Sequence, residues 1–113
     1  MAVRINNITD EAHQRHIVIL DDQEVELTLR FLPVVESWFI DVTYGGRSAA
    51  GFKLSLNTLH MLSQNYPFDF VVQDLSGRGV DPFRIDDFSE NRCALFMLQT
   101  ADMAEIRGAD VPV

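Results

Sequence analysis

A chain of 113 residues with 47% hydrophobic residues holds enough apolar material for one domain with its own core. Its 17 acidic and 9 basic side chains give a formal charge of -8, which repels phosphate backbones and anionic lipids and therefore argues against nucleic-acid and membrane binding. The single cysteine, Cys93, excludes an internal disulfide, and no apolar run approaches the roughly 20 residues of a membrane span.

The N-terminal half of the chain predicts two β-hairpins. Apolar and polar residues alternate strictly over 25–31 and 38–44, which places successive side chains on opposite faces of half-buried strands. Asp21, Asp22 and Gln23 supply a turn between strands over 16–20 and 24–31. Gly45 and Gly46 supply the positive φ angles of a two-residue turn before a strand over 47–54.

The alternation also predicts which side chains of the strand over 38–44 form the core. Trp38, Ile40 and Val42 share one face of this strand and are expected to be buried. Asp41 and Thr43 share the other face and are expected to point outward or to meet a neighbour.

The segment after residue 55 is the one interior stretch with helical periodicity. Leu56, Leu59 and Leu62 recur at helical spacing, Asn57 is a suitable N-cap, and Pro67 would end the helix, so a short interior helix is predicted. His60 lies beside this leucine stripe and is expected to be partly exposed.

The remaining segments complete an all-β domain. They are a strand over 68–75, a loop over 76–79, an irregular crossing over 81–91, a buried strand over 93–100, one or two helical turns over 101–107 and a tail over 108–113. We expect a single domain over 1–113, with an N-terminal arm 1–15, a core 16–100 and a C-terminal tail 101–113. Its architecture is a small antiparallel barrel or sandwich of about 6 or 7 strands with the short interior helix.

No pattern of side chains predicts a metal, cofactor or catalytic site. The acidic residues Asp81, Asp86, Asp87 and Glu90 lack the glycine and the ligand spacing of a calcium loop. His13 and His16 have no third ligand at recognisable spacing, and Cys93 is expected to be an inert core thiol. The loop over 76–79 lacks the Lys-Ser/Thr of a phosphate-binding loop. We therefore expect a protein that is not an enzyme.

A set of residues in a fixed order resembles a known family. The set comprises the strand over 27–30, Trp38-Phe-Ile-Asp41, Gly45-Gly46, Gly51 with Leu54, Leu59 and Leu62 with Tyr66, Asp86-Asp87-Phe88 and the closing strand over 94–97. Over about residues 16–100 the sequence is similar to the phage baseplate plug family, small all-β proteins of contractile-tailed phages. Within this set the structural or interface candidates are Trp38, Asp41, Gly45, Gly46, Gly51, Asp86, Asp87 and Phe88.

The resemblance implies a structural virion component, made in the host cytoplasm, that plugs or lines the distal end of the tail tube. Its partners would be hub, tail tube and wedge proteins and further copies of itself, without nucleic acid, membrane or cofactor. The isolated chain is expected to be monomeric or weakly associated, with 1–10 and 108–113 mobile until neighbours order them. Two alternatives remain: a small-ligand-binding β-barrel, and a metal-dependent enzyme that uses the acids of 81–90.

Overall fold

The computed structural model describes residues 2–61 and 66–109, and side chains up to residue 105. Within that part of the chain there are seven strands and one helix. They are β1 (Val3–Arg4), β2 (His13–Leu20), β3 (Gln23–Leu32), β4 (Ser37–Tyr44), β5 (Arg47–Lys53), β6 (Asp69–Asp74), β7 (Cys93–Leu98) and α1 (Thr100–Ala109).

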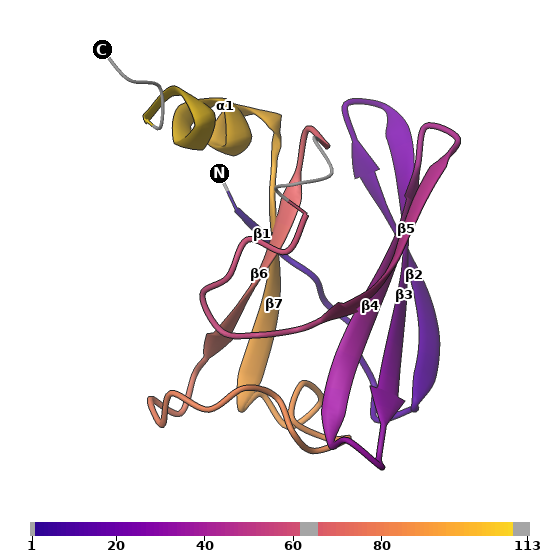
Figure 1. The fold of residues 1–113 in the computed structure, drawn as a ribbon, viewed down its shortest axis with the longest axis vertical. Coiled ribbons are helices and arrows are strands. Elements are labelled where there is room, and N and C mark those ends of the chain that lie inside the picture. The colour runs from indigo at the N-terminus through magenta and orange to yellow at the C-terminus, as the bar shows by residue number, and fades with distance from the viewer. Residues whose placement is uncertain (1, 62–65, 110–113) are drawn as a thin grey trace.

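The strands form two antiparallel sheets that face each other as a sandwich (Figure 1). One sheet has the order β2-β3-β4-β5, and the other has the order β1-β7-β6. The all-β prediction and the antiparallel sandwich are thereby confirmed, and the sheets do not close into a barrel. No helix among the described residues is long and apolar enough to cross a membrane.

Two-residue turns with positive φ angles build the larger sheet. Asp21 and Asp22 have φ angles of 48° and 65° between β2 and β3, and Gly45 and Gly46 have φ angles of 57° and 78° between β4 and β5. Positive φ at both turn residues matches the right-handed twist of the strands, which explains why glycine stands at the second turn. Both predicted turns are confirmed.

The core lies between the two sheets and follows the predicted register. Trp38, Ile40 and Val42 of β4 are at most 1% exposed, whereas Asp41 is half-buried and Thr43 is exposed. The facing strands contribute the same alternation, and the near-continuous apolar run of β7 is buried from Cys93 to Leu95. Burial of these side chains is the main stabilising contribution to a domain of this size.

The interior helix is the one predicted element that the structure contradicts. Residues 56–61 form a β-bridge and turns, with Leu56 paired in parallel with Val72, and the predicted continuation over 62–65 lies outside the described residues. Asn57 has a positive φ of 53°, which is incompatible with a helix start. The helix of this fold is α1, where the sequence predicted one or two helical turns.

His60 is also less exposed than predicted. Its side chain is 9% exposed, Nε2 accepts a hydrogen bond from the Ser55 backbone N–H at 2.9 Å, and Nδ1 lies 2.7 Å from the Phe70 carbonyl oxygen. The imidazole thus provides partners for backbone groups of Ser55 and Phe70 and links the 55–61 segment to β6.

The first residues contribute to the fold rather than standing apart as an arm. Val3 and Arg4 form β1 against β7, and Ile5 is 5% exposed in the core. The segment then crosses to the larger sheet, where Gln14 donates from its amide to the carbonyl oxygens of Thr9 and Glu11 at 2.9 Å each. Within the predicted C-terminal tail, residues 110–113 lie outside the described residues.

Candidate functional site

The structure divides the eight candidate residues into three groups. Trp38, Asp86, Asp87 and Phe88 lie at the end of the sandwich where the 75–92 loop passes beneath the sheets (Figure 1). Asp41 and Gly51 are neighbours on the outer face of the larger sheet. Gly45 and Gly46 form the β4–β5 turn. These residues therefore do not make a single pocket.

Asp87 organises the 75–92 loop. Its Oδ2 accepts hydrogen bonds from the backbone N–H groups of Phe83 and Arg84 at 2.7 and 2.8 Å. The same carboxylate binds Arg92 through both oxygens, from Nε at 2.8 Å and from Nη2 at 2.9 Å. Arg92 reaches Asp74 Oδ2 at 3.1 Å with Nη1. We call Asp74, Asp87 and Arg92 the loop clamp.

Arg92 uses its complete set of donors in this clamp. Besides the two carboxylates, Nη1 donates to the Val80 carbonyl oxygen at 3.1 Å and Nη2 donates to the Asp81 carbonyl oxygen at 2.9 Å. All five guanidinium N–H groups therefore have an acceptor, and the ring of Phe83 lies 5.2 Å from the guanidinium carbon. A lysine could not satisfy this geometry.

The loop clamp is buried, and its charges depend on one another. The side chains of Arg92, Asp74 and Asp87 are 12%, 4% and 3% exposed. Burial by itself raises the pKa of Asp87, but hydrogen bonds from Arg92 and from the backbone outweigh it and lower that pKa. The Ser76 hydroxyl is the largest cause that lowers the pKa of Asp74, to about 2. Both carboxyls are therefore ionised at neutral pH.

Trp38 and Phe88 connect the 75–92 loop to the core. The indole Nε1 of Trp38 donates to the Arg84 carbonyl oxygen at 2.9 Å, and Phe88 packs edge-on against the same ring with centroids 5.6 Å apart. The ring of Phe31 also packs against Trp38, with centroids 5.5 Å apart. Asp87 thus holds the loop by a polar contact with Arg92, and Phe88 holds it by an apolar contact with Trp38.

Asp86 plays a different part from its neighbour. Its backbone carbonyl oxygen accepts a hydrogen bond from the Glu90 N–H at 2.8 Å, which closes a turn of the loop. Its carboxylate does not belong to the loop clamp. The two adjacent acids therefore offer a matched pair, in which one side chain holds the loop and the other does not.

Asp41 stabilises a β-bulge in β5. The ladder between β4 and β5 shifts register between Ile40 and Val42, because Ala50 and Gly51 together face Asp41. Asp41 Oδ1 accepts a hydrogen bond from the Gly51 N–H at 2.8 Å, and Gly51 has a φ of 81° that favours glycine. The aspartate and the glycine of the predicted motif therefore belong to one structural feature.

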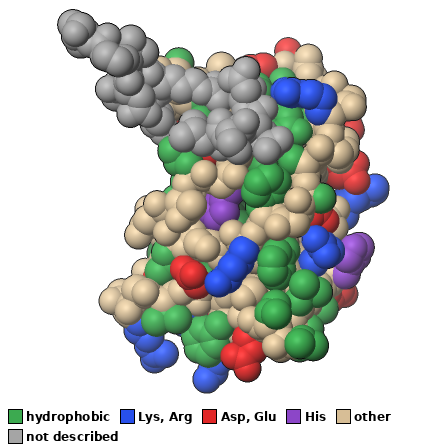
Figure 2. All heavy atoms as spheres, in the orientation of Figure 1, with side chains coloured by type: hydrophobic (Ala, Val, Ile, Leu, Met, Phe, Trp, Pro, Cys, Tyr) green, Lys and Arg blue, Asp and Glu red, His purple; other side chains and the backbone are tan. Residues whose placement is uncertain are grey.

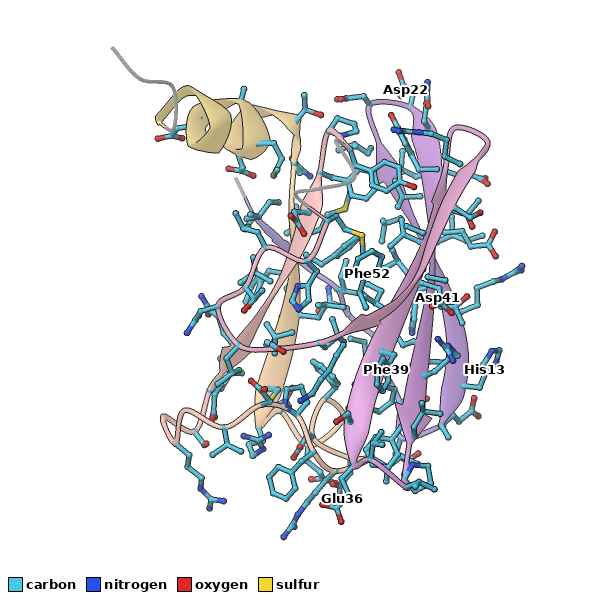
Figure 3. All side chains as sticks on the ribbon, viewed as in Figure 1. His13, Asp22, Glu36, Phe39, Asp41 and Phe52 are labelled. Carbon is cyan, nitrogen blue, oxygen red and sulfur yellow. The ribbon has the colours of Figure 1, made fainter. Side chains whose placement is uncertain are left out.

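Arg30 completes this bulge. Its Nε donates to Asp41 Oδ2 at 2.9 Å and its Nη2 donates to Oδ1 at 3.1 Å. Burial raises the pKa of Asp41, but the hydrogen bonds from Arg30 and Gly51 outweigh it and lower that pKa. Asp41 lies on the outer face of the sheet with His13 and Phe39 (Figure 3).

The acidic loop is not arranged as a metal centre. Asp87 is bound to Arg92, while Asp81 Oδ1 accepts a hydrogen bond from the Leu56 N–H at 2.9 Å. Among residues 2–61 and 66–109, no group of three or more His, Cys, Asp or Glu side chains is placed to hold a metal ion. Burial raises the pKa of the Cys93 thiol to about 11, so the reactive thiolate is scarce at neutral pH.

The sequence did not point to Arg92 or Asp74, and Arg30 stood in the resemblance only as the last residue of the strand over 27–30, without a partner. A buried aspartate needs a cation or several donors, so the prediction of Asp87 as a structural residue could have prompted a search for an arginine nearby. Arg92 stands five residues after Asp87, immediately before the buried strand β7. Asp74 is 18 residues away from Arg92, and no local spacing indicates that contact.

Comparison with known proteins gives one family match. The model of the family described as cyanophage baseplate Pam3 plug gp18 matches residues 3–100, from β1 to the first residue of α1. A search of curated proteins finds no match. The matched stretch contains the loop clamp, the Asp41–Gly51 bulge and the complete sandwich. The chain belongs to the cyanophage baseplate Pam3 plug gp18 family.

Proposed function

We propose that this protein plugs or lines the distal end of the phage tail tube through contacts with neighbouring tail proteins. The family is one of baseplate plugs, which implies a virion component of the tail that contacts other tail proteins and a structural rather than catalytic role. The finer proposal names hub, tail tube and wedge proteins as neighbours, together with further copies of this chain in the particle.

The observation that carries this proposal is an exposed apolar end of the sandwich. Hydrophobic side chains gather where the β3–β4 turn meets the 75–92 loop (Figure 2). The members of this apolar end are Leu32 (39% exposed), Val34 (96%), Val35 (55%), Val80 (42%) and Ile85 (38%). Apolar side chains concentrated in this way are typical of surfaces that contact another protein.

The loop clamp makes this apolar end a preformed surface. Val80 and Ile85 belong to the loop that Arg92, Asp87 and Trp38 hold in place. Val35 of the β3–β4 turn and Val80 of the loop line one groove of about 440 Å³. Because the loop is already ordered, binding a neighbour costs less conformational entropy than ordering a free loop would.

The net charge supports a place beside the DNA channel. A formal charge of -8 leaves the rest of the surface predominantly acidic. A channel wall of this sign repels the phosphates of passing DNA and prevents adhesion. The apolar end then provides attachment, while the acidic surface remains available to face the channel.

Particle assembly tests the proposal. We expect that deletion of the gene prevents assembly of infectious tails and that the wild-type chain supplied in trans restores them. The double variant Val34→Asp, Val35→Asp should fold with an unchanged melting temperature and fail to restore assembly, because charges would be buried in the contact. The matched control is Thr43→Asp, an equally polar change on the exposed outer face, which should restore assembly. Normal tails from the deletion strain would refute the proposal.

A further inference from the structure

The two edges of the larger sheet are built differently. The β5 edge is interrupted by the bulge at Gly51, a common means of preventing strand pairing. The β2 edge pairs with β3 through eight consecutive residues, His13 to Leu20, without a register shift. β2 therefore presents a long regular edge that a further strand can join.

The hydrogen-bonding groups on this edge can be assigned from the ladder. The Phe31 N–H donates to the Ala12 carbonyl oxygen at 2.7 Å, so alternate residues from Ala12 onward direct their backbone polar groups toward β3. The intervening residues His13, Arg15, Ile17 and Ile19 direct theirs away from β3, and the last three of them lie within the pairing proposed below. An open groove of about 370 Å³ runs beside this edge, lined by residues 16–19 and by the 3–7 segment.

The outward side chains of the β2–β3 hairpin are segregated by character. Arg15 and Arg30 place cationic groups at one end of the outer face, where Arg15 lies 3.3 Å from Glu26 and Arg30 binds Asp41. Ile17 and Ile19, 49% and 60% exposed, form an apolar middle. Asp21, Asp22 and Glu24 make the turn end acidic. Along β2 the outward side chains thus run from the cationic Arg15 through Ile17 and Ile19 to the acidic turn, with Glu26 and Glu24 of β3 beside the two isoleucines.

We propose that β2 pairs antiparallel with β2 of a second copy of this chain, about a twofold axis at Ile17. The twofold axis reverses the second strand, so the basic end of each hairpin faces the acidic end of the other, which parallel pairing would not achieve. Ile17 then lies opposite Ile17 of the second copy, and Arg15 lies opposite Ile19. The two four-stranded sheets become one continuous sheet.

This pairing is self-complementary, which favours a second copy over an unrelated partner. The three outward-facing residues of each edge provide about six backbone hydrogen bonds. A contact between two strand edges is smaller than standard protein interfaces, so the dimer is weak and depends on concentration. The inference concerns the purified chain alone and therefore does not rest on the proposed plug function.

Sedimentation velocity of the purified chain over a wide concentration range tests the pairing. We expect a monomer–dimer equilibrium in the wild type and an association at least about tenfold weaker in Ile17→Lys, which places two ammonium groups next to each other at the axis. Thr43→Lys is the control, since it adds the same charge to the exposed outer face of the same sheet, on β4, away from the β2 edge. This control should associate as strongly as the wild type, and both variants should have the melting temperature of the wild type.

Exchange of charges sharpens the test. Arg15→Glu and Glu24→Arg should each weaken the dimer, because each sets like charges against one another across the axis. The double variant again sets position 15 of one copy and position 24 of the other at opposite charge and should recover part of the lost association. Amide hydrogen exchange at Ile17 and Ile19 should slow as the concentration rises. A wild type that stays monomeric, growth beyond dimers, or an Ile17→Lys variant that associates unchanged would each overturn the proposal.

Discussion

Asp41 and Asp87 are held by the same groups in different surroundings. Each carboxylate binds an arginine through two oxygens, and Asp41 accepts a hydrogen bond from one backbone N–H whereas Asp87 accepts from two. The side chain of Asp41 is 26% exposed on the face of a sheet, whereas that of Asp87 is 3% exposed beneath a loop. Hydrogen-bond geometry alone does not distinguish the two sites.

The two sites differ in whether water can hydrate the groups that remain when one partner of the ion pair is lost. At Asp41, solvent can hydrate either partner when the pair is broken, and the surrounding ladder holds the strands together without it. At Asp87, the loss of one partner leaves Arg92 charged and buried and leaves loop N–H groups without an acceptor. We therefore expect loss of the Asp87 carboxylate to destabilise the fold strongly and loss of the Asp41 carboxylate to destabilise it only slightly.

The largest expected effect is that of Asp87→Asn. This variant should lower the free energy of unfolding by about 3 kcal/mol, because it leaves the Arg92 charge without its bidentate partner in a buried site. Urea denaturation followed by tryptophan fluorescence measures the change, since Trp38 packs against this loop. Asp86→Asn is the control and should stay within about 0.5 kcal/mol of the wild type. Equal losses in both variants would contradict the assignment of the loop clamp.

A smaller effect is expected for Asp41→Asn. The variant should lose about 1 kcal/mol, because the pair with Arg30 is partly exposed and the asparagine oxygen can still accept from the Gly51 N–H. The same urea titration measures it. A loss as large as that of Asp87→Asn would show that burial does not separate the two sites.

The smallest expected effect is a change in how the free energy of unfolding depends on pH. Asp41, Asp74 and Asp87 have pKa values lowered from 3.8, to about 2 for Asp74, so their contribution is complete above about pH 4 and is lost as the pH falls through the folded values. Burial raises the pKa of Asp69, so that residue has the opposite dependence. Acid titration of stability should be flatter in Asp87→Asn than in the wild type, because the variant lacks one carboxyl with a lowered pKa. If the free energy of unfolding fell equally steeply with acid in both proteins, the stabilisation of the ionised Asp87 by Arg92 would be contradicted.

Local patterns predicted most of the sandwich. The alternation in β3 and β4 and the turns at Asp21-Asp22 and Gly45-Gly46 are determined by neighbours in sequence, and the structure confirms them. The helix predicted after residue 55 is wrong over its described part, because Leu56 bridges to Val72 of β6 and tertiary pairing outweighs helical periodicity.

The candidate site could be predicted in part. The resemblance identified Asp41 with Gly51 and Asp87 with Phe88, but not the arginine that binds each aspartate. Arg30 lies diagonally across from Asp41 through the register of β3 and β4, and Arg92 lies beside Asp74 because β6 and β7 pair Asp74 with Cys93. Contacts of that kind depend on the path of the chain, which spacing along the sequence does not encode.

Cryo-electron microscopy of intact tails, at a resolution that shows side chains, tests the central claim most directly. We expect density for this two-sheet sandwich at the distal end of the tail tube, with Val34, Val35 and the 75–92 loop buried against neighbouring tail proteins. A map in which the distal end is complete without this chain, supported by its absence from mass spectra of the purified tails, would contradict the claim.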